Sequence, residues 1–418
     1  MDSGCIIRNP DKTITIMLNR KINRNHNSIF IVILSMIWFE FAFATKVYTQ
    51  SNQSGIYKIR DLVIYENPSF YSSFPSVVKR ADGELLVAFR RAPDRNLFKE
   101  KEISHVDPNS YLVMVHSKDN ARTWSEDPDL IFAYPFGGSQ DPCLLQLRNG
   151  NLLCMSYAWA FVRTEGLALL KQPVSENVAG SVFLGGYYVL SDDAGKSWKG
   201  PYYPPHILPE IYLDAFGQPL TAYNRGELFE SKGGRIYWVV AASYNNSSNN
   251  TGNYLLISND KGLTWEYSCP VAVDDKVSFN EASVYETVKG DVVAFIRTDS
   301  FNDHACIARS TDGGKSFSHW QDMGFQGHPL HALRLPDNRV LLTYGYRHKP
   351  YGIRARILNQ DCTDFNTSTE FTIRDDGGSG DIGYPWSVQL NGNQVLVVYY
   401  FNISNGTRHI AGSILEIK

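Results

Sequence analysis

Four octapeptides decide the fold of this chain: SKDNARTW at residues 117–124, SDDAGKSW at 191–198, SNDKGLTW at 258–265 and STDGGKSF at 310–317. They share the template Ser-x-Asp-x-Gly-x-Ser/Thr-aromatic. An Asp carboxylate can accept backbone N–H bonds within a tight turn, and Gly supplies a positive φ. The pattern predicts four equivalent hairpin turns, structural rather than calcium-binding, with Ala121 altering the first of them at the Gly position.

The repeats return at the scale of one propeller blade. A decayed fifth copy begins at Asn359, so that successive copies start 74, 67, 52 and 49 residues apart. That is the size of a four-stranded blade with variable loops. Six β-rich runs lie between Gly turns: Leu85–Phe89, Leu152–Tyr157, Ile236–Ala241, Val292–Ile296, Val340–Tyr344 and Val395–Tyr400. We therefore expect an all-β fold, a six-bladed β-propeller with these octapeptides, known as Asp boxes, on its hairpins.

Both ends of the repeat region are predicted to be strands. Ile56–Tyr65 and His409–Ile417 have strand composition, and the first is expected to complete the last blade beside the second, which removes free sheet edges. No linker or shift in composition divides residues 45–418, so we expect one domain there.

Residues 1–44 have the features of a secretory signal peptide. Basic residues from Arg8 to Arg24 precede the apolar run Ile29–Phe39, and Ala42-Phe43-Ala44 offers a cleavage site. The run is shorter than the roughly 20 apolar residues of a membrane span, although an uncleaved type II anchor is the alternative. We expect a secreted or lumenal glycoprotein, with no stable span after cleavage. Its sequons are at Asn52, Asn245, Asn246, Asn249, Asn366, Asn402 and Asn405.

Charge and cysteine content restrict the partners. The formal net charge is −3 and the isoelectric point about 6.4, so there is no basic surface for nucleic acid. Without Cys5, which lies in the leader, an odd number of cysteines remains, so at least one thiol is free or pairs between chains. No cluster has the spacing of a metal site, and the sequence leaves the oligomeric state open.

Repeated Asp boxes behind a secretory leader resemble the sialidase (neuraminidase) superfamily, over about residues 55–418. The resemblance implies an exo-acting glycoside hydrolase that removes terminal sialic or related acidic sugars from glycans, with no cofactor. A sialidase holds the substrate carboxylate with three arginines and uses tyrosine as its nucleophile. A glutamate activates the tyrosine, and an aspartic acid acts on the leaving-group side.

Three catalytic residues follow from this resemblance. Phe279-Asn280-Glu281-Ala282, followed by a strand reaching Arg297, is similar to the glutamate-then-arginine segment, which makes Glu281 the base and Arg297 a carboxylate ligand. Residues 381–388, DIGYPWSV, resemble the nucleophile segment and offer Tyr384. The acid is expected in the loop after the second strand of the first blade. Asp107 is the first candidate there, with His105 beside it and Asp94 in reserve.

The carboxylate ligands depart from the family pattern. Phe74-Pro75-Ser76 stands where sialidases have Arg-Ile-Pro, and Arg90 or Arg91 could replace the missing arginine. The third arginine is Arg347 or Arg354, with Arg347 preferred because it ends a strand. Three further polar residues are expected to line the pocket: Asp141, Arg225 and His328.

Two alternatives follow from the missing arginine. One is a uronate-directed hydrolase or polysaccharide lyase with His105, His328 or Tyr384 carrying protons, and the other is a non-catalytic glycan-binding propeller. The intact Glu281 and Arg297 segments favour the sialidase-like hydrolase, which requires the Tyr384 hydroxyl to lie within hydrogen-bond reach of Glu281.

Overall fold

The computed structural model describes residues 54–95, 99, 105–177, 180–245, 250–404 and 406–418. The predicted leader at 1–44 and the sequons at Asn52, Asn246, Asn249 and Asn405 lie outside the described residues. Within the part of the chain that is described, no helix is long and apolar enough to cross a membrane.

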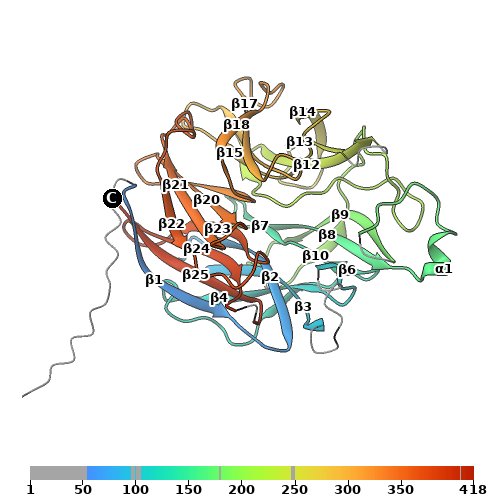
Figure 1. Ribbon diagram of the computed structural model, residues 1–418, viewed down its shortest axis with the longest axis horizontal. Coiled ribbons are helices and arrows are strands. Elements are labelled where there is room, and N and C mark those ends of the chain that lie inside the picture. The colour runs from blue at the N-terminus through green and yellow to red at the C-terminus, as the bar shows by residue number, and fades with distance from the viewer. Residues whose placement is uncertain (1–53, 96–98, 100–104, 178–179, 246–249, 405) are drawn as a thin grey trace, which may run out of the picture. The chain divides into compact units, whose positions relative to one another are not determined.

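The described residues form six small antiparallel sheets around a common centre, the blades of a propeller (Figure 1). Blades 1 and 2 consist of β2 (Phe70–Lys79), β3 (Leu85–Pro93), β4 (Tyr111–Ser117) and β5 (Asp129–Phe132), then β6 (Gly138–Ser139), β7 (Cys143–Gln146), β8 (Leu152–Phe161), β9 (Ser181–Ser191) and β10 (Lys199–Tyr202). Blades 3 and 4 consist of β11 (Phe229–Glu230), β12 (Ile236–Asn245), β13 (Asn250–Ser258) and β14 (Glu266–Ala272), then β15 (Phe279–Glu286), β16 (Val292–Thr298), β17 (His304–Ser310) and β18 (Gln321–Gln326). Blades 5 and 6 consist of β19 (Leu330–Arg334), β20 (Val340–Tyr346), β21 (Gly352–Leu358) and β22 (Glu370–Arg374), then β23 (Gly383–Gln389), β24 (Gln394–Phe401), β25 (His409–Ile417) and β1 (Ile56–Tyr65). One short helix, α1 (Thr164–Leu167), follows β8. The predicted fold class is confirmed.

Burial follows the order of the strands in a blade. The second strands are apolar along their length and buried on both faces, as in β24, because each blade packs between two neighbours. The fourth strands are polar and half exposed, as in β18. Apolar clusters fill the spaces between successive blades: one runs through blades 6, 1, 2 and 3, another lies between blades 3 and 4, and another between blades 4 and 5.

The Asp boxes occupy equivalent hairpins, between the third and fourth strands of blades 1 to 4, and the decayed copy occupies the same place in blade 5. In the third box the Asp260 carboxylate accepts hydrogen bonds from the backbone and hydroxyl of Thr264, at 2.9 and 2.6 Å. The Ser258 hydroxyl also contacts this carboxylate, at 2.9 Å, and accepts from the Gly262 amide at 2.8 Å. The same bonds around Asp193 lower the pKa of that carboxyl to about 2. The Asp carboxylate and the Ser and Thr hydroxyls of the turn are thus satisfied locally, whereas the Trp265 indole N–H has no partner among the described residues.

Ala121 has φ +65° where the other boxes have glycine, and its amide donates to Ser117 Oγ at 3.1 Å as theirs do, so the first turn keeps the common geometry with a strained alanine instead of an altered one. A left-handed backbone disfavours any residue with a Cβ. Ala121 is fully buried, however, and its carbonyl accepts a hydrogen bond from Arg60 of β1 at 3.2 Å.

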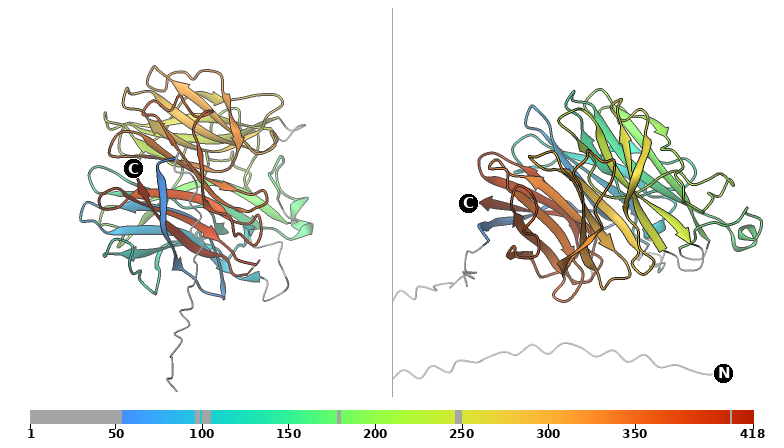
Figure 2. Two further views of the ribbon diagram at one scale, coloured as in Figure 1. Left: turned by 60° about the vertical axis from the view of Figure 1, so that its left-hand side comes forward. Right: turned by 90° about the horizontal axis from the view of Figure 1, so that it is seen from above.

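The first strand closes the ring. β1 pairs antiparallel with β25 along its length, from Ile56 opposite Ile417 to Tyr65 opposite Ile410. Figure 2 shows β1, in blue, beside the red C-terminal strands from a second direction. The predicted completion of the last blade by an N-terminal strand is confirmed.

The predictions about the cysteines and the glycosylation sequons can be compared with the structure. The five described cysteines are buried free thiols, so no disulfide links any two of them. Asn402 is fully buried, and its amide donates to Ser379 Oγ and to the Asp381 carbonyl, so the predicted glycosylation of this sequon does not fit the fold. Asn366 is exposed.

Candidate active site

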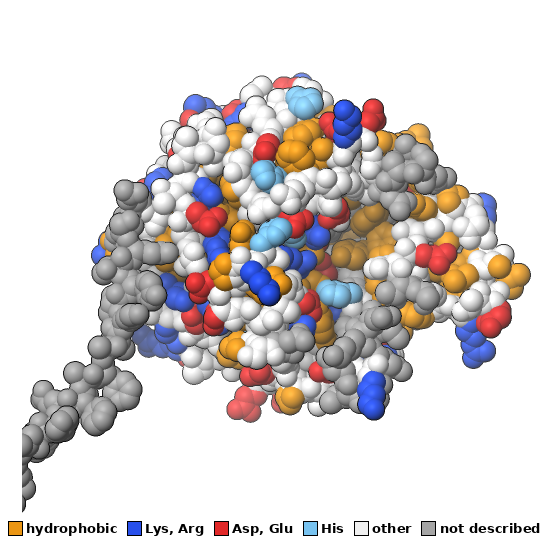
Figure 3. All heavy atoms as spheres, viewed as in Figure 1, with side chains coloured by type: hydrophobic (Ala, Val, Ile, Leu, Met, Phe, Trp, Pro, Cys, Tyr) orange, Lys and Arg blue, Asp and Glu red, His pale blue; other side chains and the backbone are white. Residues whose placement is uncertain are grey.

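Five of the six blades contribute to a cavity of about 550 Å³. That volume is typical of a pocket for a small ligand. Figure 3 shows a hollow on the face seen in Figure 1, with hydrophobic and charged side chains together in and around it. Its charged and titratable lining residues are His105, Asp141, Arg225, Glu281, Arg297, Asp299 and three tyrosines, Tyr157, Tyr223 and Tyr384.

Three of the lining residues sit in β-bulges at the entry of a blade's first strand. The register shifts between Ser73 and Ser76 in β2, between Phe279 and Ala282 in β15, and between Gly383 and Trp386 in β23. These shifts contain Phe74, Glu281 and Tyr384. A bulge re-aims one side chain without breaking the sheet, and here three bulges aim three side chains at one place.

Tyr384, Glu281 and Arg297 form a directly bonded group. The Tyr384 hydroxyl donates to Glu281 Oε1 at 2.5 Å, although the two residues are 103 positions apart. Arg297 Nη1 donates to Glu281 Oε2 at 2.8 Å and to the Tyr384 hydroxyl oxygen at 3.2 Å. The Tyr384 hydroxyl therefore lies within hydrogen-bond distance of Glu281, as the sialidase-like mechanism requires.

The electrostatics keep the Tyr384 hydroxyl protonated in the resting site. Burial and the negative charge of Glu281 raise the pKa of Tyr384 well above its usual value, against the opposing effect of Arg297. A phenol in this state needs a base to attack. Glu281, which accepts its hydrogen bond, is in position to take the proton.

Three arginines surround Tyr384. The Arg225 guanidinium lies 4.6 Å and that of Arg347 5.1 Å from the centre of its ring, in addition to the Arg297 contact. Arg225 is 1 % exposed, and its Nε and Nη1 have no hydrogen-bond partner among the described residues. Arg347 donates to the Ile382 carbonyl and to the Tyr400 hydroxyl, both at 3.0 Å. Only Arg225 and Arg297 line the cavity.

The other arginines predicted to bind substrate lie elsewhere. Arg354 is buried and donates to backbone carbonyls of Pro350 and Arg374. Arg91 donates to the hydroxyls of Tyr111 and Tyr65, and its guanidinium stacks on a phenyl ring. Both guanidinium groups are thus held by neighbours outside the cavity lining.

Phe74 occupies the place of the missing first arginine. It has φ +56°, lines the cavity, and packs edge-on against the ring of Tyr384 at 4.7 Å between centroids. Arg90, opposite Ser73 in the sheet register, is fully buried beneath, 5.7 Å from the ring of Tyr71, and does not line the cavity. An apolar ring therefore lies at the position where the resemblance implied an arginine.

Asp107, the first candidate for the acid, is held in an ion pair. Its carboxylate is fully buried and accepts from Arg95 Nε at 2.6 Å and Arg95 Nη2 at 3.0 Å. It also accepts from the Asn109 amide at 2.8 Å. Neither Asp107 nor Asp94 is among the residues that line the cavity.

His105 lies in the cavity wall and contacts the half-buried carboxylate of Asp381. Its Nε2 is 3.5 Å from Asp381 Oδ1 and 3.4 Å from the Tyr71 hydroxyl. Asp381 also accepts from the hydroxyls of Tyr71 and Tyr400, at 2.8 and 2.9 Å, and from Arg408 Nε at 2.8 Å. Burial by itself would raise the pKa of Asp381, but its bonds and opposite charges, first those of His105, hold that pKa far below its usual value.

Asp141 enters the cavity at an interruption of blade 2, between β6 and β7. It is 1 % exposed, and burial together with the charge of Glu281 raises its pKa to about 6. The interruption depends on Gly138, because a Cβ there would lie 1.8 Å from the Asp107 carbonyl oxygen. A carboxyl that exchanges its proton near neutral pH thus faces the Tyr384 group.

The sequence did not suggest an aromatic wall on the opposite flank. Tyr157, Trp159, Phe183 and Tyr223 line the cavity from blades 2 and 3. The Phe183 and Tyr223 rings meet edge-on at 4.4 Å. Tyr157, Trp159 and Phe183 carry no motif, whereas Tyr223 is two residues before Arg225, which was expected to line the pocket.

His328 does not line the cavity. It is 4 % exposed, and burial together with the positive charges of Arg297 and Arg347 lowers its pKa to about 2. A neutral, buried imidazole of this kind packs behind the site rather than in it. The neighbouring His331 is also buried, with Nδ1 accepting from the Ser387 amide at 3.2 Å.

Fold and repeats together define a class, the Asp-box propellers. The BNR repeat-like domain family matches residues 161–397, more than half of the chain, and the chain belongs to that family. The resemblance to the sialidase superfamily is confirmed in repeat and fold. A search of the curated proteins returned no match.

Several solved structures are similar to this chain. A crystal structure of a protein of unknown function from Dyadobacter fermentans is 65% identical, covering 87% of this chain and 100% of that one, with a TM-score of 0.85. The NanB sialidase from Streptococcus pneumoniae is 14% identical, with 86% and 70% of the two chains covered and a TM-score of 0.57. A Trypanosoma rangeli sialidase in complex with sialic acid is also 14% identical, with 86% of this chain and 57% of that one covered and a TM-score of 0.57. The two sialidases share the fold.

Proposed function

We propose that this protein is a secreted, exo-acting glycoside hydrolase that removes a terminal sialic or related acidic sugar from glycans. The observation that carries the proposal is the 2.5 Å hydrogen bond from the Tyr384 hydroxyl to Glu281 on the cavity wall. A tyrosine paired with a carboxylate base is the arrangement of the glycosidases that use Tyr as nucleophile.

The reaction follows from this group. Glu281 takes the phenol proton while the Tyr384 oxygen attacks the anomeric carbon, and the glycosidic bond breaks as its oxygen takes up a proton from an acid on the leaving-group side. That acid recovers a proton from the water of the second step. Water then releases the sugar from Tyr384, and the proton returns from Glu281. Arg297, 3.2 Å from the tyrosine oxygen, stabilises the negative charge that develops there.

An acidic sugar suits the arginines around Tyr384. Arg225 and Arg297 both line the cavity, and both contact Tyr384, Arg225 over its ring and Arg297 at its hydroxyl. Guanidinium groups are the preferred partners of carboxylates. The aromatic wall at Tyr157 and Tyr223 offers flat faces for the sugar that follows in the glycan.

A non-catalytic glycan-binding propeller is the second candidate. Arg297 is already paired with two carboxylates, Glu281 at 2.8 Å and Asp299 at 3.1 Å, and Phe74 covers the place of the third arginine. In that case the cavity would bind a glycan without hydrolysing it.

Turnover of 4-methylumbelliferyl glycosides by the full chain tests the proposal. We expect hydrolysis of an acidic member of a panel containing the α-sialoside, β-glucuronide and α-iduronide, but not of the neutral β-galactoside. Tyr384→Phe should lose at least about 100-fold in kcat, because the nucleophile is gone, while glycan binding persists. A fluoride of the hydrolysed sugar that carries a second fluorine on the carbon next to the anomeric carbon should add the mass of the fluorinated sugar to Tyr384.

Tyr399→Phe is the matched control, because this buried tyrosine bonds to Ser413 outside the cavity. It should keep the wild-type kcat. Binding of acidic glycans without hydrolysis of any panel member would support the second candidate instead.

A further inference from the structure

We propose that His105, oriented by Asp381 and Tyr71, is the general acid and base on the leaving-group side of the reaction. The inference rests on the proposed function of Tyr384. It assigns to an imidazole the role for which the sequence suggested the Asp107 carboxyl.

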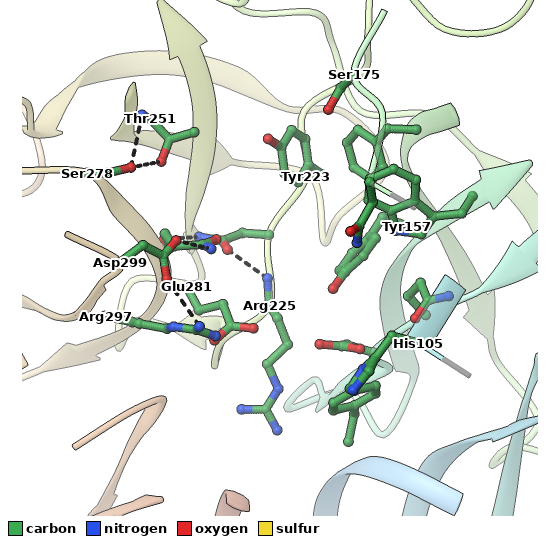
Figure 4. Close-up of a pocket in the computed structure, with 18 of the residues that line it drawn as sticks. His105, Tyr157, Ser175, Tyr223, Arg225, Thr251, Ser278, Glu281, Arg297 and Asp299 are labelled. Atoms are coloured by element: carbon green, nitrogen blue, oxygen red, sulfur yellow. Dashed lines mark hydrogen bonds and ion pairs between the residues drawn. The ribbon is translucent and has the colours of Figure 1, made fainter. Parts of the chain in front are cut away.

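The position of His105 fits the role. It belongs to the β3–β4 loop, where the acid was expected, and its side chain is 53% exposed in the cavity wall. Figure 4 shows His105 on the opposite side of the cavity from Glu281 and Arg297. A retaining glycosidase needs its acid and its nucleophile on the two sides of the bond that breaks.

Asp107 does not present a free acid. Both of its carboxylate oxygens accept from Arg95, and its side chain is fully buried. To reach a substrate, its carboxyl would have to leave Arg95 and become exposed. His105, two residues earlier, already lines the cavity with an exposed side chain.

Asp381 fixes the imidazole. The carboxylate is itself held by Tyr71 of β2, Tyr400 of β24 and Arg408, so it offers His105 a rigid, ionised partner. Nε2 faces Asp381 and Tyr71, at 3.5 and 3.4 Å, and no hydrogen bond to Nδ1 is present within the described part of the chain. An imidazole held at one nitrogen by a carboxylate, with the other nitrogen free, is the arrangement of an oriented acid–base histidine.

The proton balance closes over two steps. In the first, the C–O glycosidic bond breaks as the Tyr384 oxygen bonds to the anomeric carbon. The His105 imidazolium protonates the leaving oxygen, and Glu281 receives the phenol proton. In the second, neutral His105 takes a proton from water as that water attacks the same carbon. The Tyr384–carbon bond breaks, and Glu281 returns the proton to the phenolate. The net change is the hydrolysis of one glycoside.

Leaving-group dependence tests the assignment. The probes are the 4-methylumbelliferyl and methyl glycosides of the acidic sugar that wild type hydrolyses, beginning with the α-sialoside pair. His105→Gln should lower kcat/KM for the methyl glycoside by about 100- to 10,000-fold, because its alkoxide cannot leave unprotonated. The umbelliferyl glycoside needs no such help and should lose less than about 10-fold. Azide, which needs no base, should accelerate its turnover and yield the glycosyl azide.

His304→Gln is the matched control, since His304 pairs with Asp322 at 3.0 Å outside the cavity lining. It should leave both rates unchanged. Equal losses on both glycosides without azide rescue, in a variant that melts like wild type, would overturn the role of His105 and leave that of Tyr384 intact. If the wild-type protein hydrolyses no acidic glycoside and forms no adduct on Tyr384, the proposed function is wrong, and so is the role proposed for His105.

Discussion

Two carboxyls beside one cavity, the buried Asp141 and the half-buried Asp381, shift their pKa values in opposite directions. Asp141 is raised to about 6 by burial and by Glu281, whereas Asp381, despite its burial, is held far below its usual value by His105, Arg408 and Tyr71. The first residue is near its titration point at neutral pH, and the second is a fixed charge. The same residue type thus contributes stability in opposite pH ranges.

Asp141→Asn should change the pH dependence of stability. A folded-state pKa raised from 3.8 to about 6 means that the stabilisation due to Asp141 is complete below about pH 4 and is lost as the pH rises through 6. Between about pH 3 and pH 8, the free energy of unfolding of wild type should therefore fall by about 3 kcal/mol relative to the variant. Urea unfolding at both pH values measures this difference.

Asp381→Asn is the control with the opposite sign. The folded-state pKa of Asp381 is lowered, so its stabilisation is present above the unfolded value and is lost as the pH falls. This variant should be destabilised at pH 7 and progressively less so in acid. Parallel pH curves for wild type and either variant would contradict the assigned shift.

At this scale the sequence predicted part of the site. Tyr384, Glu281 and Arg297 were proposed from their flanking segments, and the structure places them in one bonded group. Asp107 shows the limit, because its partner Arg95 carries no signal in the sequence. The conformation of the loop decides which cation pairs with an aspartate in it. A sequence pattern does not show that conformation, so such an aspartate is predicted to be solvent-exposed. Nothing in the sequence predicted the contact between Asp381 and His105 either, because it too depends on how a loop folds.

Hairpins and bulges are the elements that position the site. Bulges at Phe74, Glu281 and Tyr384 direct side chains into the cavity. The Asp boxes stabilise the hairpins between the third and fourth strands of blades 1 to 4. The boxes were predictable because their hydrogen bonds close within eight residues. The bulges were not predictable, because an extra residue in a strand can be recognised only when the register with its partner strand is known.

Glycine in an Asp box should be harder to replace than glycine in an open turn. Gly314 and Gly290 both have left-handed φ values, +84° and +95°. A Cβ on Gly314 would lie 2.7 Å from Leu255 Cδ2 in the next blade, whereas nothing lies within 4 Å of one on Gly290. Gly290→Ala should cost about 1 kcal/mol for its backbone alone, and Gly314→Ala a further 1–3 kcal/mol or so for overpacking. Denaturant unfolding of both variants makes the comparison, and equal losses would contradict it.

For the whole molecule, the six β-rich runs and the blade-sized spacing of the repeats predicted the number of blades, and the strand pattern at the two ends predicted their pairing. The aromatic wall of Tyr157, Trp159, Phe183 and Tyr223 could not be predicted. These residues converge only after blades 2 and 3 pack side by side, so no local pattern marks them.

Closure of the ring by β1 should be essential to stability. Deleting residues 54–65 would leave the backbone groups of β25 unpaired along one edge and expose the apolar residues that pack against Ile64 and Tyr65. We expect a variant that aggregates and melts well below wild type, because an open strand edge pairs with other chains. Light scattering and thermal unfolding are the measurements.

Val63→Thr is the matched control on the same strand, because Val63 is 54% exposed. It should behave like wild type in both assays. A soluble deletion variant that melts at the wild-type temperature would show that five blades and an incomplete sixth are self-sufficient.

The pairing of β1 with β25 also fixes an order of events during synthesis. Ile56 emerges from the ribosome 361 residues before its partner Ile417 (417 minus 56), so the sixth blade cannot be finished until translation of that last strand is complete. Blades 1 to 5 contain only consecutive strands and can assemble as they emerge, which leaves β1 waiting with an unpaired edge throughout. A nascent chain in that condition is prone to wrong partners. The cell that makes this protein must therefore shield one early strand until the final one arrives.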